Sequence, residues 1–531
     1  MFSFAFLLGL YANCILLLGL ANLYQTPVLL VFTLFYLFFS VIFWKKFDEQ
    51  LDSKAIRDEI RMLFIRYPLW SLGIALAICI MLIGVLSPEL AFDALWYHLT
   101  LPKLYLSFGG IRYIPGGLLY YSTLPKVGEM FYTASLSFGN EILAHLVHFI
   151  FALLVTVAVY CITKKYASQK IAIIAVAIFL SNIVVLWEAT TAYVDLIRAF
   201  FEIMALWGII EYFEKKNNKW LIESAFLYGL ALETKLVAVF SLPIFLAALF
   251  LFGFKSLKGR ISDIGIFIFL SLLVSLSWFV FSYIHTGNPI YPLLSNYPIK
   301  LGQDTLSFPN TITDLITIFI NASDPVSPIY LMLFPLIFLV RKNITKKEPM
   351  ILWLSLIALL CWTVTPKTGG GRFLIPYLPL FSIMLGIVLM KAQKINLLYQ
   401  FSLFSIAMVL FTSIFYRGAA EIRNLPVILG IEPKQTFLVK HLNFSYGDFY
   451  DIDHNLVKLT HGKTVLLYGF HNLYYMDVPF IDSSYVKRGD SFSYIATQNT
   501  QLPKRFFYWQ PIYFDQKTKM TLYSMGQDWV Y

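Results

Sequence analysis

The sequence predicts a polytopic α-helical membrane protein with a small outward-facing α/β domain at its C-terminal end. Of its 531 residues 58% are hydrophobic and only 14% are charged, and the mean hydropathy is +0.69. Apolar segments of about 20 residues, long enough to cross ~30 Å of hydrocarbon, recur along the chain. Since backbone amides in lipid must be satisfied within their own segment, we expect these segments to be helices.

About thirteen segments meet this description. They cover residues 4–22, 27–44, 69–86, 142–162, 170–188, 193–212, 219–233, 236–254, 265–284, 329–341, 350–366, 372–390 and 395–415. The first has neither a basic start nor a small-residue cleavage site, which favours a retained helix over a signal peptide.

Lysines and arginines indicate the orientation, because they gather in every second connection. The basic connections lie at 45–66, 164–170, 215–219, 255–260, 341–347 and 391–394. Positive charge marks the cytoplasmic side, so the N-terminus is expected inside and the C-terminus outside a plasma membrane. The same distribution explains the net charge of +10, and no basic face with interleaved aromatics is left to bind nucleic acid.

The remaining connections then face outward and divide the chain into three parts. We expect a first helix pair with its cytoplasmic loop at 1–68, a catalytic core at 69–415 and an outward C-terminal domain at 416–531. Short amphipathic helices are expected in the outward loop 87–141, and irregular chain in the Pro-rich loop 285–328. Residues 464–468 and 506–509 in the last part are predicted to be strands.

Asp93 is the first candidate for a catalytic residue. It follows Pro88 in the outward loop, with Glu89, Tyr97 and His98 close in sequence. A carboxylate at a bilayer surface could accept the proton of an acceptor hydroxyl. It could equally cap the short helix that follows, and His98 alone is typical of a hydrogen-bonded surface histidine. The clustering of the four side chains favours a functional site.

Asp195 is the second acidic candidate, at the outer mouth of the sixth predicted span. An ionisable group there is costly unless it faces a cavity or a partner, which favours function. Stabilisation by the dipole of its helix is the alternative.

Three basic residues lie on the same predicted outer side, where Lys and Arg are scarce: Lys126, Lys235 and Arg372. Cations at a membrane surface are natural binders of phosphate, although each could instead snorkel to lipid head groups. Glu233 could neutralise Lys235, and the glycines before Arg372 would let the backbone approach a ligand closely.

Motifs of soluble enzymes are missing from the sequence. His461-Gly462-Lys463-Thr464 resembles the end of a P-loop, but position 457 is Val where that motif needs Gly. No cofactor is predicted. A divalent metal held by Asp93, Glu89 and His98 is possible but not expected.

The chain resembles the GT-C superfamily of polytopic glycosyltransferases, and within it the aminoarabinose transferases and protein O-mannosyltransferases. The resemblance rests on the acidic outward loop, the second acid at the next outward turn, Gly229-Leu230-Ala231-Leu232-Glu233-Thr234-Lys235, and the Arg372-Phe373 start of a Pro-containing helix. It covers roughly residues 70–415.

The resemblance implies transfer of a sugar from a polyprenyl-phosphate donor to an acceptor outside the membrane, with inversion. Asp93 would be the base and Asp195 would orient the acceptor or the base. Lys126, Lys235 and Arg372 would contact the donor phosphate, and Glu89, Tyr97 and His98 would line the substrate site. The acceptor, whether lipid, glycan or protein, is not implied.

Two features depart from the family pattern. The first two spans precede its usual first helix, and Glu89 and Asp93 stand four apart where many members have adjacent acids. A transporter or flippase of lipid-linked saccharide is the main alternative and predicts polar residues deep in the spans, for which Glu202, Asn182 and Glu223 are candidates. A scaffold that displays the C-terminal domain is a third hypothesis.

Overall fold

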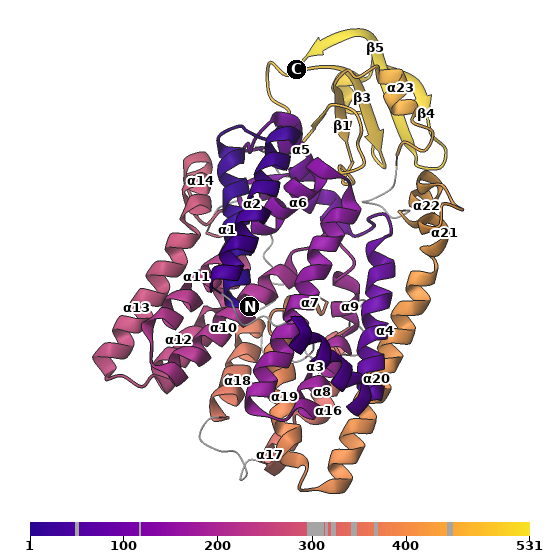
Figure 1. Cartoon of the computed structure of the whole chain (residues 1–531). Coiled ribbons are helices and arrows are strands. Elements are labelled where there is room, and N and C mark those ends of the chain that lie inside the picture. Colours follow the sequence, from indigo (N-terminus) through magenta and orange to yellow (C-terminus); the bar gives the residue numbers. More distant parts are fainter. Residues whose placement is uncertain are drawn as a thin grey trace.

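The computed structural model describes residues 1–47, 53–115, 118–294, 313, 317–319, 325–340, 348–365, 370–442 and 450–531. Most of the predicted loop 285–328 and the basic connection 341–347 therefore lie outside the described residues. A long helical body carries a β-sheet domain at one end, beside α5 and α22 (Figure 1).

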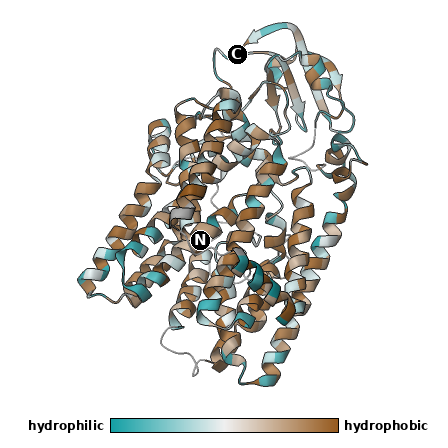
Figure 2. Cartoon of the chain, in the orientation of Figure 1, coloured by the Kyte–Doolittle hydropathy of each residue, from teal (hydrophilic) through white to brown (hydrophobic). Residues whose placement is uncertain are grey.

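The helical body contains a helix in each predicted span. Its main helices are α1 (Phe2–Leu20), α2 (Thr26–Phe47), α4 (Pro68–Val85), α7 (Glu141–Tyr166), α8 (Gln169–Leu180), α9 (Ile183–Glu188), α10 (Asp195–Lys215), α11 (Asn218–Thr234), α12 (Leu242–Phe252), α13 (Leu257–Val274), α14 (Leu276–Thr286), α16 (Ile329–Leu333), α17 (Leu336–Val340), α18 (Pro349–Val364), α19 (Leu378–Ala392) and α20 (Asn396–Ile422). These helices are mainly hydrophobic, whereas α3 (Ser53–Arg66), between α2 and α4, is largely polar (Figure 2).

Within the described residues, five helices are long and apolar enough to cross a membrane unaided: α1, α2, α4, α7 and α20. The pair α13–α14, bent by 61° at its break, makes a sixth. The protein is thus a mostly helical multi-span membrane protein. Helix length and composition alone identify five or six crossings among the described residues, fewer than the predicted number.

A polar residue explains why the predicted span 170–188 is broken. Asn182 ends α8, since its side-chain amide donates to the carbonyl oxygens of Ile178 and Phe179 at 3.1 and 2.8 Å. Its Oδ1 accepts from the backbone N–H of Ser327 at 2.9 Å. One predicted span therefore consists of α8 and α9, with the freed backbone groups satisfied by a side chain.

The loop between α4 and α7 folds into the short helices that the sequence predicts. A π-helical turn η1 (Ala94–His98) leads into α5 (Thr100–Phe108), followed by the 3₁₀ turn η2 (Tyr120–Thr123) and α6 (Val127–Phe138). Gly128 lets α6 approach the next acidic turn closely, since a Cβ atom there would lie 2.3 Å from Val194 Cγ1.

The sheet domain comprises residues 450–531 and follows the short helices α21 (Leu425–Ile428) and α22 (Lys434–His441). After α23 (Asn455–Thr460) come β1 (Val465–Tyr468), β2 (Phe480–Asp482), β3 (Ser491–Gln498), β4 (Gln510–Phe514) and β5 (Met520–Val530). The strand order is β2-β1-β3-β5-β4, with β1 parallel to β2 and β3 and the remaining pairs antiparallel. A small mixed α/β domain, as predicted, therefore ends the chain.

The two faces of the sheet pack differently because successive side chains of a strand point to opposite sides. Leu466 joins Phe492, Phe506 and Trp509 in a separate small core. Val465 and Leu467 join the main core of the protein. The strand predicted at 506–509 is wrong: a 3₁₀ turn, η6 (Lys504–Phe506), and the following turn bring Phe506 and Trp509 into this small core, whereas Phe507 is exposed.

Candidate functional site

Five of the predicted site residues meet: Tyr97 lies within η1, and the other four come from the ends of different elements. Asp93 precedes η1, Asp195 is the first residue of α10 and Lys235 follows α11. Arg372 begins the 3₁₀ turn η5 (Arg372–Leu374) ahead of α19. At the end of a helix, a side chain can point out of the apolar core while the backbone of that residue is still fixed by the helix.

Asp93 is paired with Arg372. The guanidinium Nη1 lies 2.6 Å from Asp93 Oδ2, and the Tyr97 hydroxyl donates to the same oxygen at 3.2 Å. The side chains of Asp93 and Arg372 are 16% and 15% exposed, so the pair is reachable from outside the protein.

Asp195 forms the second half of the cluster. Lys235 Nζ lies 2.7 and 2.9 Å from its two carboxylate oxygens, and Asp195 is only 1% exposed. Arg372 Nε lies 3.4 Å from Asp195 Oδ2 and 3.8 Å from Glu188 Oε1. Arg372 therefore joins the accessible acid, Asp93, to the buried acids, Asp195 and Glu188.

Aromatic rings hold the cations of this cluster in place. The Arg372 guanidinium lies 4.6 Å from the centroid of the Tyr193 ring, and the Lys235 ammonium lies 5.5 Å from that of Phe373. The backbone N–H of Asp93 donates to the Tyr193 hydroxyl at 3.3 Å. Such cation–π contacts restrict the positions of otherwise flexible side chains.

The Asp93 carboxyl stays ionised despite its surroundings. Burial raises its pKa, but the positive charges of Arg372 and Lys235 oppose that effect, and the pKa falls below its ordinary value. A carboxylate in this state can accept a proton at neutral pH.

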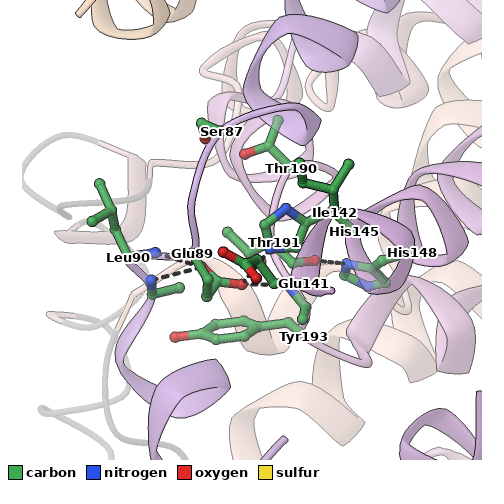
Figure 3. Close-up of polar contacts among 12 residues, drawn as sticks. Ser87, Glu89, Leu90, Glu141, Ile142, His145, His148, Thr190, Thr191 and Tyr193 are labelled. Carbon is green, nitrogen blue, oxygen red and sulfur yellow. Dashed lines mark hydrogen bonds and ion pairs between the residues drawn. The ribbon is translucent and has the colours of Figure 1, made fainter. Parts of the chain in front are cut away.

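Glu89 occupies a different network, shown in Figure 3. Its Oε1 accepts from the N–H groups of Leu90 and Ala91 at 2.9 and 2.8 Å. Its Oε2 accepts from Ala192 N–H at 2.7 Å and lies 3.0 Å from His145 Nε2. At 1% exposure, this carboxylate ties the Asp93 loop to α7 and to the turn before α10.

His148 fixes that same turn from α7 (Figure 3). Its Nδ1 lies 2.8 and 2.9 Å from the carbonyl oxygens of Glu188 and Thr191, and its Nε2 accepts from Leu196 N–H at 3.2 Å. Sequence analysis missed Glu188, His145 and His148, which lie within apolar spans. Their polarity in such a setting is the only sequence signal that could have found them.

His98 and Lys126 lie in a third, buried group with Glu129. His98 Nδ1 is 2.8 Å from Glu129 Oε1, and all three side chains are buried. Burial lowers the pKa of Lys126 to about 8, with Glu129 opposing the shift. Thus His98, predicted to line the substrate site, and Lys126, predicted to contact the donor phosphate, lie outside the Asp93–Arg372 cluster.

The suggested metal site does not form. Glu89 pairs with His145 and His98 with Glu129, so neither converges with Asp93. Among the described residues no group of three His, Cys, Asp or Glu side chains is arranged to hold a metal ion.

A cleft of about 830 Å³ separates α5 from the sheet domain. The α5 side contributes Lys103, Phe108 and Arg112, and the sheet domain contributes Asp477 and Phe480. Aromatic faces beside charged groups suit a ligand that is partly apolar and rich in hydroxyls.

The fold and this cluster define a multi-span membrane protein in which the ends of four elements assemble a site of acidic and basic side chains. Residues 130–279 match the family described as dolichyl-phosphate-mannose-protein mannosyltransferase. The predicted resemblance to the protein O-mannosyltransferases is thereby confirmed for this part of the chain.

Two solved structures of one protein have a similar fold. ArnT from Cupriavidus metallidurans bound to undecaprenyl phosphate has a TM-score of 0.57 and 11% identity, covering 85% of this chain and 97% of that chain. Its apo state gives a TM-score of 0.55 and 10% identity over the same shares. The S. cerevisiae protein O-mannosyltransferase Pmt1-Pmt2 complex bound to the sugar donor gives a TM-score of 0.30 and 16% identity, covering 41% and 34%. No curated protein matches the sequence.

Proposed function

We propose that the protein transfers a sugar from a polyprenyl-phosphate donor to an acceptor on the extracytoplasmic side of the plasma membrane, with Asp93 as the general base. The observation that carries this proposal is the reachable Asp93 carboxylate, held at 2.6 Å from Arg372 beside the Asp195–Lys235 pair. The site thereby offers a proton acceptor and positive charge within one small volume.

The reaction follows from these charges. Asp93 takes the proton of the acceptor hydroxyl as its oxygen bonds to the anomeric carbon of the sugar. The bond from that carbon to the phosphate oxygen breaks, its electron pair leaves with the polyprenyl phosphate, and the anomeric centre is inverted. Arg372 and Lys235 stabilise the departing anion, and Asp195 keeps both cations in position.

The choice of donor rests on the relatives and on the apolar surface of this chain. One ArnT structure holds undecaprenyl phosphate, and the matching family is described by its dolichyl-phosphate-mannose substrate. A groove of about 560 Å³ between α1 and α2 is lined by apolar and aromatic side chains, among them Leu7, Tyr11, Tyr36 and Phe131. Such a groove suits an isoprenoid chain. Lys126 is a further candidate for contact with the donor phosphate.

The proposal includes a topology of about thirteen crossings, with the N-terminus inside and the C-terminus outside. The alternation of basic connections supports it. The Asp93 loop and the sheet domain then share the outer side, and the 830 Å³ cleft between them becomes the place where an acceptor saccharide would lie.

Purified protein in liposomes tests the proposal with radiolabelled polyprenyl-phosphate mannose, polyprenyl-phosphate glucose and polyprenyl-phosphate aminoarabinose as donors. We expect one donor to lose its label to an acceptor in a membrane extract, and Asp93→Asn to abolish that transfer. Asp453→Asn is the matched control, since Asp453 is an exposed aspartate of the sheet domain. Transfer by Asp93→Asn at the wild-type rate would refute the assignment.

One observation favours the flippase alternative. Arg198 and Glu202 form a 2.7 Å ion pair inside α10, both nearly fully buried, and Ser241 donates to the same Glu202 oxygen at 2.8 Å. Buried ion pairs in a membrane protein commonly mark a transport path. Movement of a fluorescent polyprenyl-phosphate sugar across liposomes without loss of its sugar would support this alternative.

A further inference from the structure

The strap segment, residues 471–477, reaches from the sheet domain to the loop that carries Asp93. It lies in the connection between the parallel strands β1 and β2. The chain leaves β1 through Gly469, which has a φ of +81°. A Cβ atom at this position would lie 2.2 Å from Gln498 O, so no larger residue fits there. The exit direction of the strap segment is therefore fixed by the sheet.

The strap segment holds the Asp93 loop ahead of the aspartate. The Tyr475 hydroxyl donates to the backbone carbonyl of Glu89 at 2.9 Å, and the Tyr475 side chain is buried. Glu89 is itself anchored to His145, so this point of the loop is fixed from two sides.

The strap segment also contacts residues of the loop next to Asp93 and on its C-terminal side. Tyr474 N–H donates to the carbonyl of Leu95 at 3.3 Å. The His471 ring lies 6.0 Å from that of Phe92, nearly parallel to it, and 5.9 Å from that of Trp96. The contacts therefore fall on both sides of Asp93 and at its immediate neighbour.

The strap segment is itself fastened to α5 and α7. Lys103 Nζ donates to the carbonyls of Tyr474 and Met476 at 2.7 and 2.8 Å and lies 3.0 Å from Asp477. The Tyr474 hydroxyl donates to Glu141 at 3.1 Å. The Tyr474–Glu141 bond is buried, which makes it more costly to lose than an exposed one.

We propose that the strap segment is a positioning element that fixes the Asp93 carboxylate for catalysis, with Tyr475 and His471 as its positioning residues. The turn η1 explains the need for it. A π-helical turn is a rare, weakly held conformation, and Asp93 makes no capping bond of its own to that turn. A base must be held within a fraction of an ångström of its working place, so outside contacts are needed. This inference rests on the proposed function.

The test compares Tyr475→Phe and His471→Ala with Tyr513→Phe. The control tyrosine lies in the same domain and accepts a 3.1 Å bond from Asn455, far from the Asp93 loop in sequence. We expect each strap variant to lower kcat roughly 10-fold with the KM for the polyprenyl-phosphate donor unchanged. Amide hydrogen exchange of residues 89–99 should accelerate, while that of α10 and α19 should not.

His471→Phe provides the conservative rescue, because it keeps a ring against Phe92 and Trp96. It should restore most of the kcat lost in His471→Ala. Unchanged exchange at 89–99 in the strap variants, or a kcat equal to that of Tyr513→Phe, would overturn the inference. If the wild type transfers no sugar, the proposed function fails, whereas the exchange comparison still decides whether the strap segment holds this loop.

Discussion

Glu89 and Asp93 stand four residues apart in one loop, and their carboxylates are held in opposite ways. Glu89 is 1% exposed and accepts three backbone N–H groups in addition to its pairing with His145. Asp93 is 16% exposed, and its neighbours are the side chains of Arg372 and Tyr97. A buried carboxylate bound by three backbone N–H groups and a histidine organises structure. A partly exposed carboxylate held by two side chains can exchange those partners for a substrate.

Among the substitutions considered for these two acids, Asp93→Asn is expected to have the largest effect on kcat. Asp93→Asn removes the proton acceptor but keeps the size and hydrogen-bonding shape of the side chain, so kcat should fall by about 10²- to 10⁴-fold. The thermal unfolding temperature should stay near that of the wild type, because Arg372 retains Asp195 and Glu188 as partners. Parallel kinetics and thermal unfolding measure both. A large stability loss with a normal kcat would reverse the assignment of the two acids.

Glu89→Gln should instead destabilise the fold by about 3 kcal/mol, because it removes a buried carboxylate that accepts three N–H groups and places amide hydrogens against those donors. Chemical unfolding in detergent measures this loss. Activity per folded molecule should fall far less than in Asp93→Asn. Normal stability with abolished transfer would place Glu89 in the chemistry.

Arg372→Gln sharpens the comparison through pH. Burial raises the Asp93 pKa and Arg372 opposes it, so the variant should have a higher Asp93 pKa than the wild type. A base works only when deprotonated, so the acid limb of kcat/KM should move to higher pH. The loss relative to the wild type should be greater at pH 5 than at pH 8. Lys463→Gln, remote in the sheet domain, is the charge-matched control, and equal losses at both pH values would contradict the pairing.

Tyr97→Phe should have the smallest effect, about 2- to 5-fold in kcat. It removes one 3.2 Å bond to Asp93 and leaves the stack of its ring on Tyr121, at 3.7 Å between centroids, in place. Steady-state kinetics with a fixed donor concentration measures this change. A loss as large as that of Asp93→Asn would show that the phenol itself takes part in proton transfer.

Hydropathy and loop charge were sufficient to predict a multi-span helical protein. The thickness of the bilayer sets the length of the spanning helices, and positive charge gathers in the cytoplasmic loops. The same reasoning placed Asp93, Asp195, Lys235 and Arg372 at helix ends on one side, where the structure brings them together. It could not separate Glu89 from Asp93, since their difference lies in contacts with His145 and Ala192, distant in sequence.

Other parts of the site depend on packing that a sequence pattern does not contain. Lys126 and His98 were predicted to lie beside Asp93 and the other cations. In the structure both lie instead in the separate buried group with Glu129 of α6. The run Phe506–Trp509 has the composition of a strand, but it forms a turn in which only Phe506 and Trp509 pack beside Leu466. Aromatic residues favour strands because they fit half-buried surfaces, and a turn over a sheet provides such a surface too.

The measurement that tests the central claim most directly records donor binding and sugar transfer in the same preparation of Asp93→Asn. A radiolabelled polyprenyl-phosphate sugar reports both, by retention on the purified protein and by appearance of label in the acceptor. We predict retention within about threefold of the wild type and no detectable transfer, since the variant lacks only the proton acceptor. Transfer at the wild-type rate with normal retention would contradict the claim that Asp93 is the base.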